Sequence, residues 1–176
     1  MEQEKNNDTS HDMGFKIYCS FGNGHRLTKN PKYREIMIQS ARTLITRFNP
    51  KVGCIRSWDY HVEVWDFPVI IDNMMNLELL FWAFKETKDS FFYKVAVSHA
   101  NTTMKNHFRP DFSSYHVIAY NPRTGKVVKK IPIKVTMMLL LGQEDRLGGC
   151  MLTRCAFVKQ ATKNICNKQK KLATSS

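Results

Sequence analysis

Residues 68–84 read PVIIDNMMNLELLFWAF, an almost continuous apolar run that contains two acidic residues, Asp72 and Glu78. A helix that is apolar on every side must be buried in the protein. A buried carboxylate without a partner is costly, so the position of Asp72 requires an explanation. Aspartate is a common N-cap of helices, and a place in a reactive site is the other interpretation that we keep open.

A second apolar segment, HDMGFKIYCSFGNG, lies sixty residues upstream and also begins near an aspartate, Asp12. In both copies a tyrosine follows the aspartate by 21 residues, Tyr33 in the first and Tyr93 in the second. Each tyrosine lies in a segment, 30–48 or 89–108, whose apolar residues recur at helical spacing. The spacing indicates an internal repeat of one nearly apolar helix and one amphipathic helix.

Stacked helix pairs of this kind build an α/α toroid, with the apolar helices inside and the amphipathic helices outside. Both aspartates would then begin inner helices and lie at the same end of the barrel. Residues 114–130 alternate around a Pro…Gly turn and predict a β-hairpin projecting from the helices. Residues 49–68 are rich in Trp, Asp and Gly, and we predict a loop able to line a sugar-binding cleft.

The composition, 43% apolar and 24% charged in 176 residues, is typical of one globular domain. The other apolar runs are far shorter than the roughly 20 residues that cross a bilayer, and the polar N-terminus predicts no signal peptide on this chain. Five cysteines without C-x-x-C spacing predict neither a disulfide framework nor a zinc site.

The net charge of +12 suggests a polyanionic partner, either nucleic acid or an acidic polysaccharide. Half of that charge lies in residues 131–176, however, and no nucleic-acid-binding motif accompanies it. A non-catalytic protein that binds polyanions or carbohydrate through this basic tail is therefore the alternative to an enzyme.

Two converging carboxylates can perform acid–base chemistry, because burial and mutual repulsion move their pKa values apart. Among the tryptophans of the 49–68 loop, we expect Trp65 to pack. Among the histidines, His116 in the predicted hairpin is a candidate site residue. The others are expected at the surface or in packing: His25, His61, His99 and His107.

Five segments carry a family resemblance: SHDMGFKIYCSFGNGHRLTKNPKY, SWDY, FPVIIDNMMNLELLFWA, HANTTMKNHFRPDFSSYHV and YNPRTGKVVKK. They closely resemble the unsaturated glucuronyl hydrolases of glycoside hydrolase family 88, from about residue 5 to about residue 130. The resemblance implies a mainly α-helical fold, an (α/α)6 barrel of which this chain holds about two helix pairs of six. It also implies a glycosidase that removes unsaturated glucuronic acid from the non-reducing end of lyase-generated oligosaccharides of the glycosaminoglycan type.

The resemblance assigns roles to individual residues. The acid–base aspartate of the family falls on Asp72, which would protonate C4 and activate the water that attacks C5 of the enol ether. Its partner falls on Asp12, in a His–Asp motif with His11. Trp58 matches a sugar-stacking tryptophan, and His116 matches a substrate-contacting histidine. The implied partner is an unsaturated uronic-acid-containing oligosaccharide, without nucleic acid or membrane, and neither a metal nor an organic cofactor is implied.

The resemblance stops after about residue 130, where the family continues with a segment that includes ARGQAWG. Codons for ARGQAWG, translated one base later, encode Gln-Glu-Asp-Arg-Leu-Gly-Gly, which is residues 143–149 of this chain. The same shift converts the family segment HQGY into Ile-Lys-Val-Thr, residues 133–136. We therefore predict a frameshift after about residue 130.

The predicted organisation has three parts: a polar N-terminal segment 1–11, a partial hydrolase domain 12–130 and a poorly ordered, out-of-frame tail 131–176. The copy would be incomplete at both ends, and we expect it to be inactive as it stands. The full-length family is periplasmic or cytoplasmic in bacteria, while the compartment of this chain is not predicted.

Overall fold

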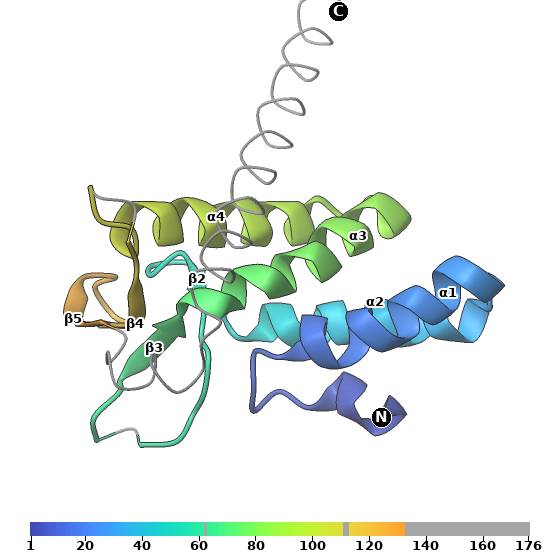
Figure 1. Ribbon diagram of the computed structural model, residues 1–176, viewed down its shortest axis with the longest axis horizontal. Helices are drawn as coiled ribbons and strands as arrows, with labels where there is room; N and C mark the ends of the chain where they lie inside the picture. The colour runs from blue at the N-terminus through green and yellow to red at the C-terminus, as the bar shows by residue number, and fades with distance from the viewer. Residues whose placement is uncertain (62, 111–112, 133–176) are drawn as a thin grey trace, which may run out of the picture. The chain divides into compact units, whose positions relative to one another are not determined.

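The computed structural model describes residues 1–61, 63–110 and 113–132, which all lie in one compact unit, Met1–Pro132. Two pairs of helices form most of this unit, and a small antiparallel sheet lies at one end of them (Figure 1). A short 3-10 helix, η1 (Glu2–Asn6), begins the chain. The predicted out-of-frame tail lies outside the described residues, apart from its first two.

The two amphipathic helices form where the sequence predicts them: α2 spans Pro31–Thr46 and α4 spans Ser90–Asn106. Each begins with a side-chain cap, because Asn30 accepts from the backbone N–H of Lys32 and Asp89 accepts from that of Phe91. The apolar face of each helix is buried, so the predicted periodicity is confirmed. Fully or nearly fully buried members are Ile36, Met37, Ala41, Leu44, Phe92, Val95, Ala96 and Ala100.

The two inner helices are also present, but neither begins as a regular α-helix. The first starts with a π-helix, η2 (Gly14–Gly22), and continues as α1 (Asn23–Thr28). The second starts with a 3-10 helix, η3 (Ile71–Asn76), and continues as α3 (Leu77–Thr87). Irregular helical turns of this kind frequently occur at functional sites, and here both lie beside the aspartates that the repeat places at the helix starts.

A three-stranded antiparallel sheet has the order β3–β4–β5, and a two-stranded one joins β1 to β2. The strands are β1 (Phe48–Asn49), β2 (Cys54–Ile55), β3 (Phe67–Ile70), β4 (Tyr115–Tyr120) and β5 (Val127–Pro132). The predicted hairpin is confirmed as β4 and β5. The prediction of a loop over residues 49–68 is wrong in part, because it contains β2 and the start of β3.

Strand β3 escaped prediction because its partner is far away in the sequence. Val69 pairs with Ile118, about fifty residues later, and nothing local indicates that partner. Pro68 also argues against a central strand, since proline cannot donate to a ladder. β3 is an edge strand of the sheet, where proline is tolerated.

Buried side chains of the three-stranded sheet and of residues 52–54 form a small hydrophobic core. It contains Val52, Cys54, Phe67, Val69, Ile118 and Tyr120. Burial raises the pKa of the Cys54 thiol to about 12, so this cysteine stays un-ionised and behaves as a small apolar side chain. Cys54 is a free cysteine in the structure.

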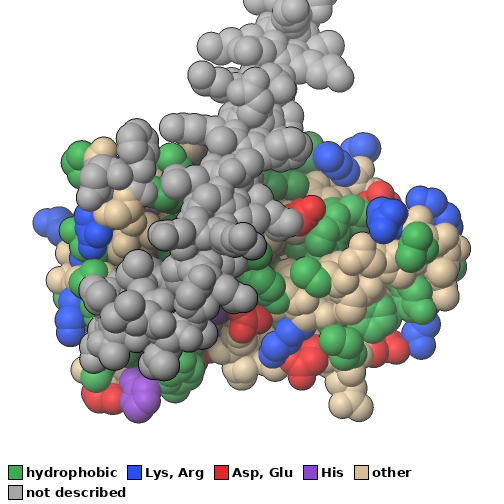
Figure 2. Space-filling view, in the orientation of Figure 1, with side chains coloured by type: hydrophobic (Ala, Val, Ile, Leu, Met, Phe, Trp, Pro, Cys, Tyr) green, Lys and Arg blue, Asp and Glu red, His purple; other side chains and the backbone are tan. Residues whose placement is uncertain are grey.

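Apolar side chains also reach the surface of the helical part, between charged residues, over the helices on the right of Figure 2. Leu27 of α1 is 71% exposed, and Phe91 at the start of α4 is 48% exposed. Single apolar residues of this kind are common on protein surfaces. Within the described ranges, no helix is both long and apolar enough to cross a membrane.

Two of the histidines expected in packing are buried in α4 or directly after it. The backbone N–H of Ile55 donates to Nδ1 of His99 at 3.0 Å, and burial lowers the pKa of His99 from 6.5 to about 3. His107 donates from Nδ1 to the Tyr115 carbonyl at 3.2 Å, and burial lowers its pKa to about 4. Both rings are therefore neutral at pH 7 and join α4 to β2 and β4.

We predict that His99 makes the fold sensitive to acid. Between pH 6.5 and about 3 the unfolded chain binds a proton at His99 that the folded chain does not. Stability is therefore fully present above pH 6.5 and is lost as the pH falls, by at most about 1.4 kcal/mol per pH unit from this residue. Asparagine at this position keeps an acceptor for Ile55 and does not titrate.

Urea unfolding of the unmodified chain and of His99→Asn at pH 8 and pH 5 provides the measurement. The free energy of unfolding should fall less between the two pH values in His99→Asn. Equal losses in the two proteins would contradict the prediction.

Candidate active site

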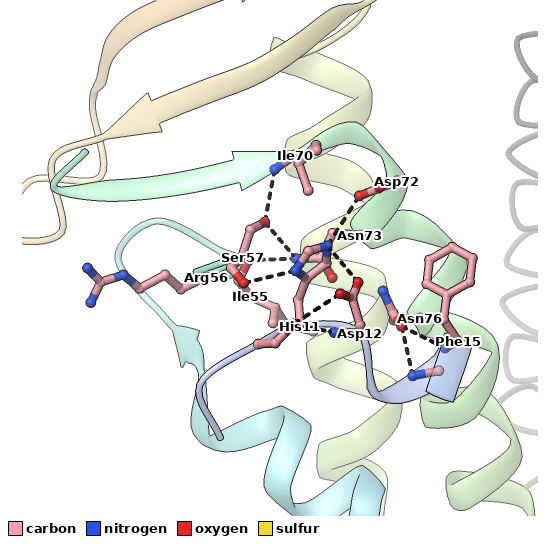
Figure 3. Close-up of polar contacts among 12 residues, drawn as sticks. His11, Asp12, Phe15, Ile55, Arg56, Ser57, Ile70, Asp72, Asn73 and Asn76 are labelled. Carbon is pink, nitrogen blue, oxygen red and sulfur yellow. Dashed lines mark hydrogen bonds and ion pairs between the residues drawn. The ribbon is translucent and has the colours of Figure 1, made fainter. Parts of the chain in front are cut away.

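The structure brings Asp12, Asp72 and His11 together at one imidazole nitrogen. Nε2 of His11 lies 3.2 Å from Oδ1 of Asp12 and 3.2 Å from Oδ1 of Asp72 (Figure 3). The aspartates are sixty residues apart in the sequence. Asp12 lies just before η2 and Asp72 lies in the first turn of η3, and these two helix starts lie side by side. The repeat therefore predicts their convergence correctly.

The capping interpretation of these aspartates is wrong. Neither η2 nor η3 has a side-chain cap from the residue that precedes it. The second carboxylate oxygen of Asp12 accepts a hydrogen bond from Ser10 Oγ at 3.1 Å, and Asp72 is held by His11. Both carboxylates are therefore directed to side chains of the site rather than to the starts of their own helices.

The three side chains differ in their access to solvent. The His11 side chain is 10% exposed, while those of Asp12 and Asp72 are 39% and 36% exposed. A molecule in solution can therefore reach the carboxylates, whereas the imidazole lies behind them.

Hydrogen bonds and close contacts hold His11 on both sides of its ring. Its Nδ1 donates to the Ser57 carbonyl oxygen at 2.8 Å. On the other side, Nε2 is hydrogen-bonded to Asp72 Oδ1 at 3.2 Å and lies equally close to Asp12 Oδ1. The imidazole therefore bridges the two carboxylates and connects them to Ser57.

Ser57 connects the site to the sheet. Besides accepting from Nδ1, its carbonyl oxygen accepts from the backbone N–H of His11 at 3.1 Å. Its hydroxyl oxygen accepts from the Ile70 N–H at 2.9 Å and from Asn73 Nδ2 at 3.4 Å. Its own N–H donates to the Pro68 carbonyl at 2.9 Å. One residue thus fixes His11 relative to the strand that leads into Asp72.

Trp58 follows Ser57 and forms an isolated β-bridge with Ser10, so it lies beside the start of the site. The ring of Tyr60 stacks on it with centroids 5.5 Å apart and an interplanar angle of 16°. Trp65 meets it edge-on at 5.9 Å, which agrees with the packing role predicted for Trp65. Trp58 is therefore part of a cluster of three aromatic rings beside the site.

An ion pair that the sequence did not reveal holds this aromatic loop. The guanidinium of Arg47 donates to both carboxylate oxygens of Asp59 at 2.7 and 3.1 Å, and Arg56 contacts the same carboxylate at 3.2 Å. Arg47 also donates to the Asp8 carbonyl. No local pattern marks such a pair, because Arg47 follows a helix and Asp59 lies in a loop.

His116 lies on β4, at a register shift between Tyr115 and Val117. Such a β-bulge redirects a side chain, and bulges are common next to active sites. Val117 pairs with Ile70, two residues before Asp72, so His116 lies near the strand end that carries Asp72. No hydrogen bond from His116 to the aspartates is recorded in the part of the chain that the structure describes.

The imidazole and carboxylates of the site do not form a metal centre. No group of three or more His, Cys, Asp or Glu side chains in the described ranges has a geometry that could hold a metal ion.

The two helix pairs, with a carboxylate at the start of each inner helix, form part of a helical barrel. No family model matches the chain. A curated unsaturated glucuronyl hydrolase of Formosa agariphila is 57% identical over 131 residues, 74% of this chain and 33% of its own length. An unsaturated chondroitin disaccharide hydrolase of Streptococcus pyogenes is 34% identical over 121 residues, 69% of this chain and 30% of its own.

The crystal structure of an unsaturated glucuronyl hydrolase specific for heparin matches with a TM-score of 0.70 and 50% identity. The match covers 73% of this chain and 34% of that protein. The chain is thus a partial homologue of the unsaturated glucuronyl hydrolases, and it spans about a third of the length of the relatives it matches. The family resemblance and the partial helical-barrel fold predicted from the sequence are confirmed.

We predict that the Ser57 hydroxyl stabilises the site. In Ser57→Ala the partly buried Ile70 N–H loses its acceptor, which costs up to roughly 1–3 kcal/mol. Ser40→Ala is a matched control, since this equally buried hydroxyl only donates to the Ile36 carbonyl within α2. Urea unfolding at pH 7.5 should show a clear loss for Ser57→Ala and little change for Ser40→Ala. Similar values for the two variants would contradict the prediction.

Proposed function

We propose that this chain is a fragment of a glycosidase that hydrates the C4–C5 enol ether of an unsaturated glucuronic acid. That sugar would stand at the non-reducing end of a lyase-generated oligosaccharide. The carboxylate pair on one imidazole is the single observation that carries the proposal. A hydration that begins with protonation of carbon needs an accessible carboxyl group to supply the proton, and two accessible carboxyl groups meet at His11 in this chain.

In the proposed reaction Asp72 donates its proton to C4, and the double-bond electrons form the new C4–H bond. A water molecule adds its oxygen to C5, and the carboxylate of Asp72 takes one proton from that water. The product is a hemiketal at C5, which opens and releases the adjoining sugar. Asp72 thus ends the cycle as it began it, and no cofactor is needed.

The other candidate residues have supporting roles in this proposal. Asp12 supplies the second carboxylate beside Asp72. His11 lies between the two and holds them in place through Nε2. Trp58 would stack on the sugar through its indole ring, and His116 would contact the substrate from the register shift in β4.

The relatives support a substrate of the glycosaminoglycan type. One is named for an unsaturated chondroitin disaccharide, and the solved structure is described as specific for heparin. Both names describe those proteins. For this chain we propose the shared chemistry, an unsaturated uronic acid linked to a second sugar, without choosing between the two.

We also propose the three-part organisation: a polar segment 1–11, a partial hydrolase domain 12–130 and an out-of-frame tail 131–176. The alternative function, non-catalytic binding of polyanions, depends mainly on that tail, which lies outside the described residues from 133 onward. No contact among the described residues favours it over a hydrolase site.

The first prediction from this proposal is that the purified chain does not turn over. Because it spans about a third of its relatives, most of the walls of a substrate pocket would have to come from elsewhere. Loss of ultraviolet absorbance from the conjugated double bond of an unsaturated chondroitin or heparin disaccharide is the assay. Release of unsaturated uronic acid above the background of an Asp72→Asn preparation would contradict the prediction.

The second prediction concerns the gene. Sequencing across codons 125–150 should show a neighbouring frame that encodes a Trp-Ala-Arg-Gly-Gln-Ala-Trp segment. A longer protein with the frame restored should then release the uronic acid, and Asp72→Asn should slow it about 100- to 10,000-fold, the usual range for a general acid–base group. Absence of the segment from every frame would contradict the predicted frameshift. Full activity of the Asp72→Asn protein would contradict the proposed role of Asp72.

A further inference from the structure

Asn76 joins the two inner helices at the level of the aspartates. It is the last residue of η3, four residues after Asp72, and it is fully buried. Its Oδ1 accepts hydrogen bonds from the backbone N–H groups of Gly14 at 2.7 Å and Phe15 at 3.3 Å. Figure 3 shows the Asn76 amide oxygen turned toward these groups, at the first turn of η2.

Gly14 makes this contact possible. A Cβ atom at position 14 would lie 2.7 Å from both Cα and Oδ1 of Asn76, closer than such atoms approach in proteins. The reason for glycine at this position is the close approach of the neighbouring helix and not a left-handed backbone conformation. Any side chain at this position would force η2 and η3 apart.

The contact replaces a cap that Asp12 does not provide. The first N–H groups of a helix have no partner within the helix and require an acceptor. In η2 that acceptor comes from the other inner helix, so both carboxylate oxygens of Asp12 stay available to Ser10 and His11. Gly14 follows Asp12 by two residues, and Asn76 follows Asp72 by four, so the same bond ties the two helix starts together.

The residue type at position 76 also fits this arrangement. An aspartate could accept the same two hydrogen bonds and would be favoured by the partial positive charge of a helix start. It would, however, add a third negative charge beside two carboxylates. Asparagine supplies the oxygen without the charge.

We propose that Asn76 is a positioning residue that sets the distance between Asp12 and Asp72, and that Gly14 is its required counterpart. Its catalytic meaning rests on the proposed function, but its geometry does not. When the Asn76 oxygen is removed, η2 is free to shift relative to η3, and the two carboxylates no longer meet at one nitrogen of His11.

The test uses nuclear magnetic resonance of the full chain at pH 7, since the 15N resonances of the His11 ring report which nitrogens carry or share a proton. In Asn76→Ala the Nε2 resonance should move toward that of a free imidazole, by more than its line width. The Nδ1 resonance should stay in place, because the bond to the Ser57 carbonyl remains.

Asn49→Ala is a matched control. Asn49 Oδ1 also accepts from two backbone N–H groups, those of Lys51 at 2.9 Å and Val52 at 3.2 Å, in the turn between β1 and β2. This variant should leave both His11 resonances unchanged. Unchanged Nε2 in Asn76→Ala, or an equal change in Asn49→Ala, would overturn the proposal.

Gly14→Ala gives a second test, because it keeps Asn76 and separates the helices by crowding. It should move the Nε2 resonance as Asn76→Ala does. If both variants unfold while Asn49→Ala remains folded, the contact serves stability alone and the positioning proposal is wrong. The readout needs no turnover, so a failed proposed function would leave these resonance changes as they are, and the two failures can be told apart.

Discussion

The imidazole of His11 allows two carboxylates to lie close together in a partly exposed site. Asp12 and Asp72 would repel each other if both were ionised with nothing between them. Nε2 lies 3.2 Å from each, so the imidazole bridges the two carboxylates. The proposed chemistry depends on the same arrangement, because it uses an accessible carboxyl group with a second one beside it.

Long-range contacts from three directions hold that arrangement in place. Ser57 fixes the far side of the imidazole and also binds the end of β3, which leads into Asp72. Asn76 ties the start of η2 to η3. The Arg47–Asp59 pair holds the loop that carries Trp58. Each contact joins segments distant in sequence or in different elements, so the site is assembled only when both helix pairs and the sheet have packed together.

The likeness to the unsaturated glucuronyl hydrolases extends over about a third of their length. Within that third the fold is coherent, because each inner helix packs on its own outer helix and the sheet has a separate core. The carboxylates lie in the matched part, whereas much of a complete barrel lies outside it.

The sequence alone determined the two helix pairs, the hairpin and the pairing of Asp12 with Asp72, because helical periodicity and a sixty-residue repeat are local or regular signals. It left the capping and reactive interpretations of the aspartates open, and only the tertiary structure excluded capping. It also gave no sign of β3, Ser57 or Asn76 as partners of the site. Their roles depend on which distant backbone groups lack an acceptor, and that is defined only once the helices and the sheet are packed together.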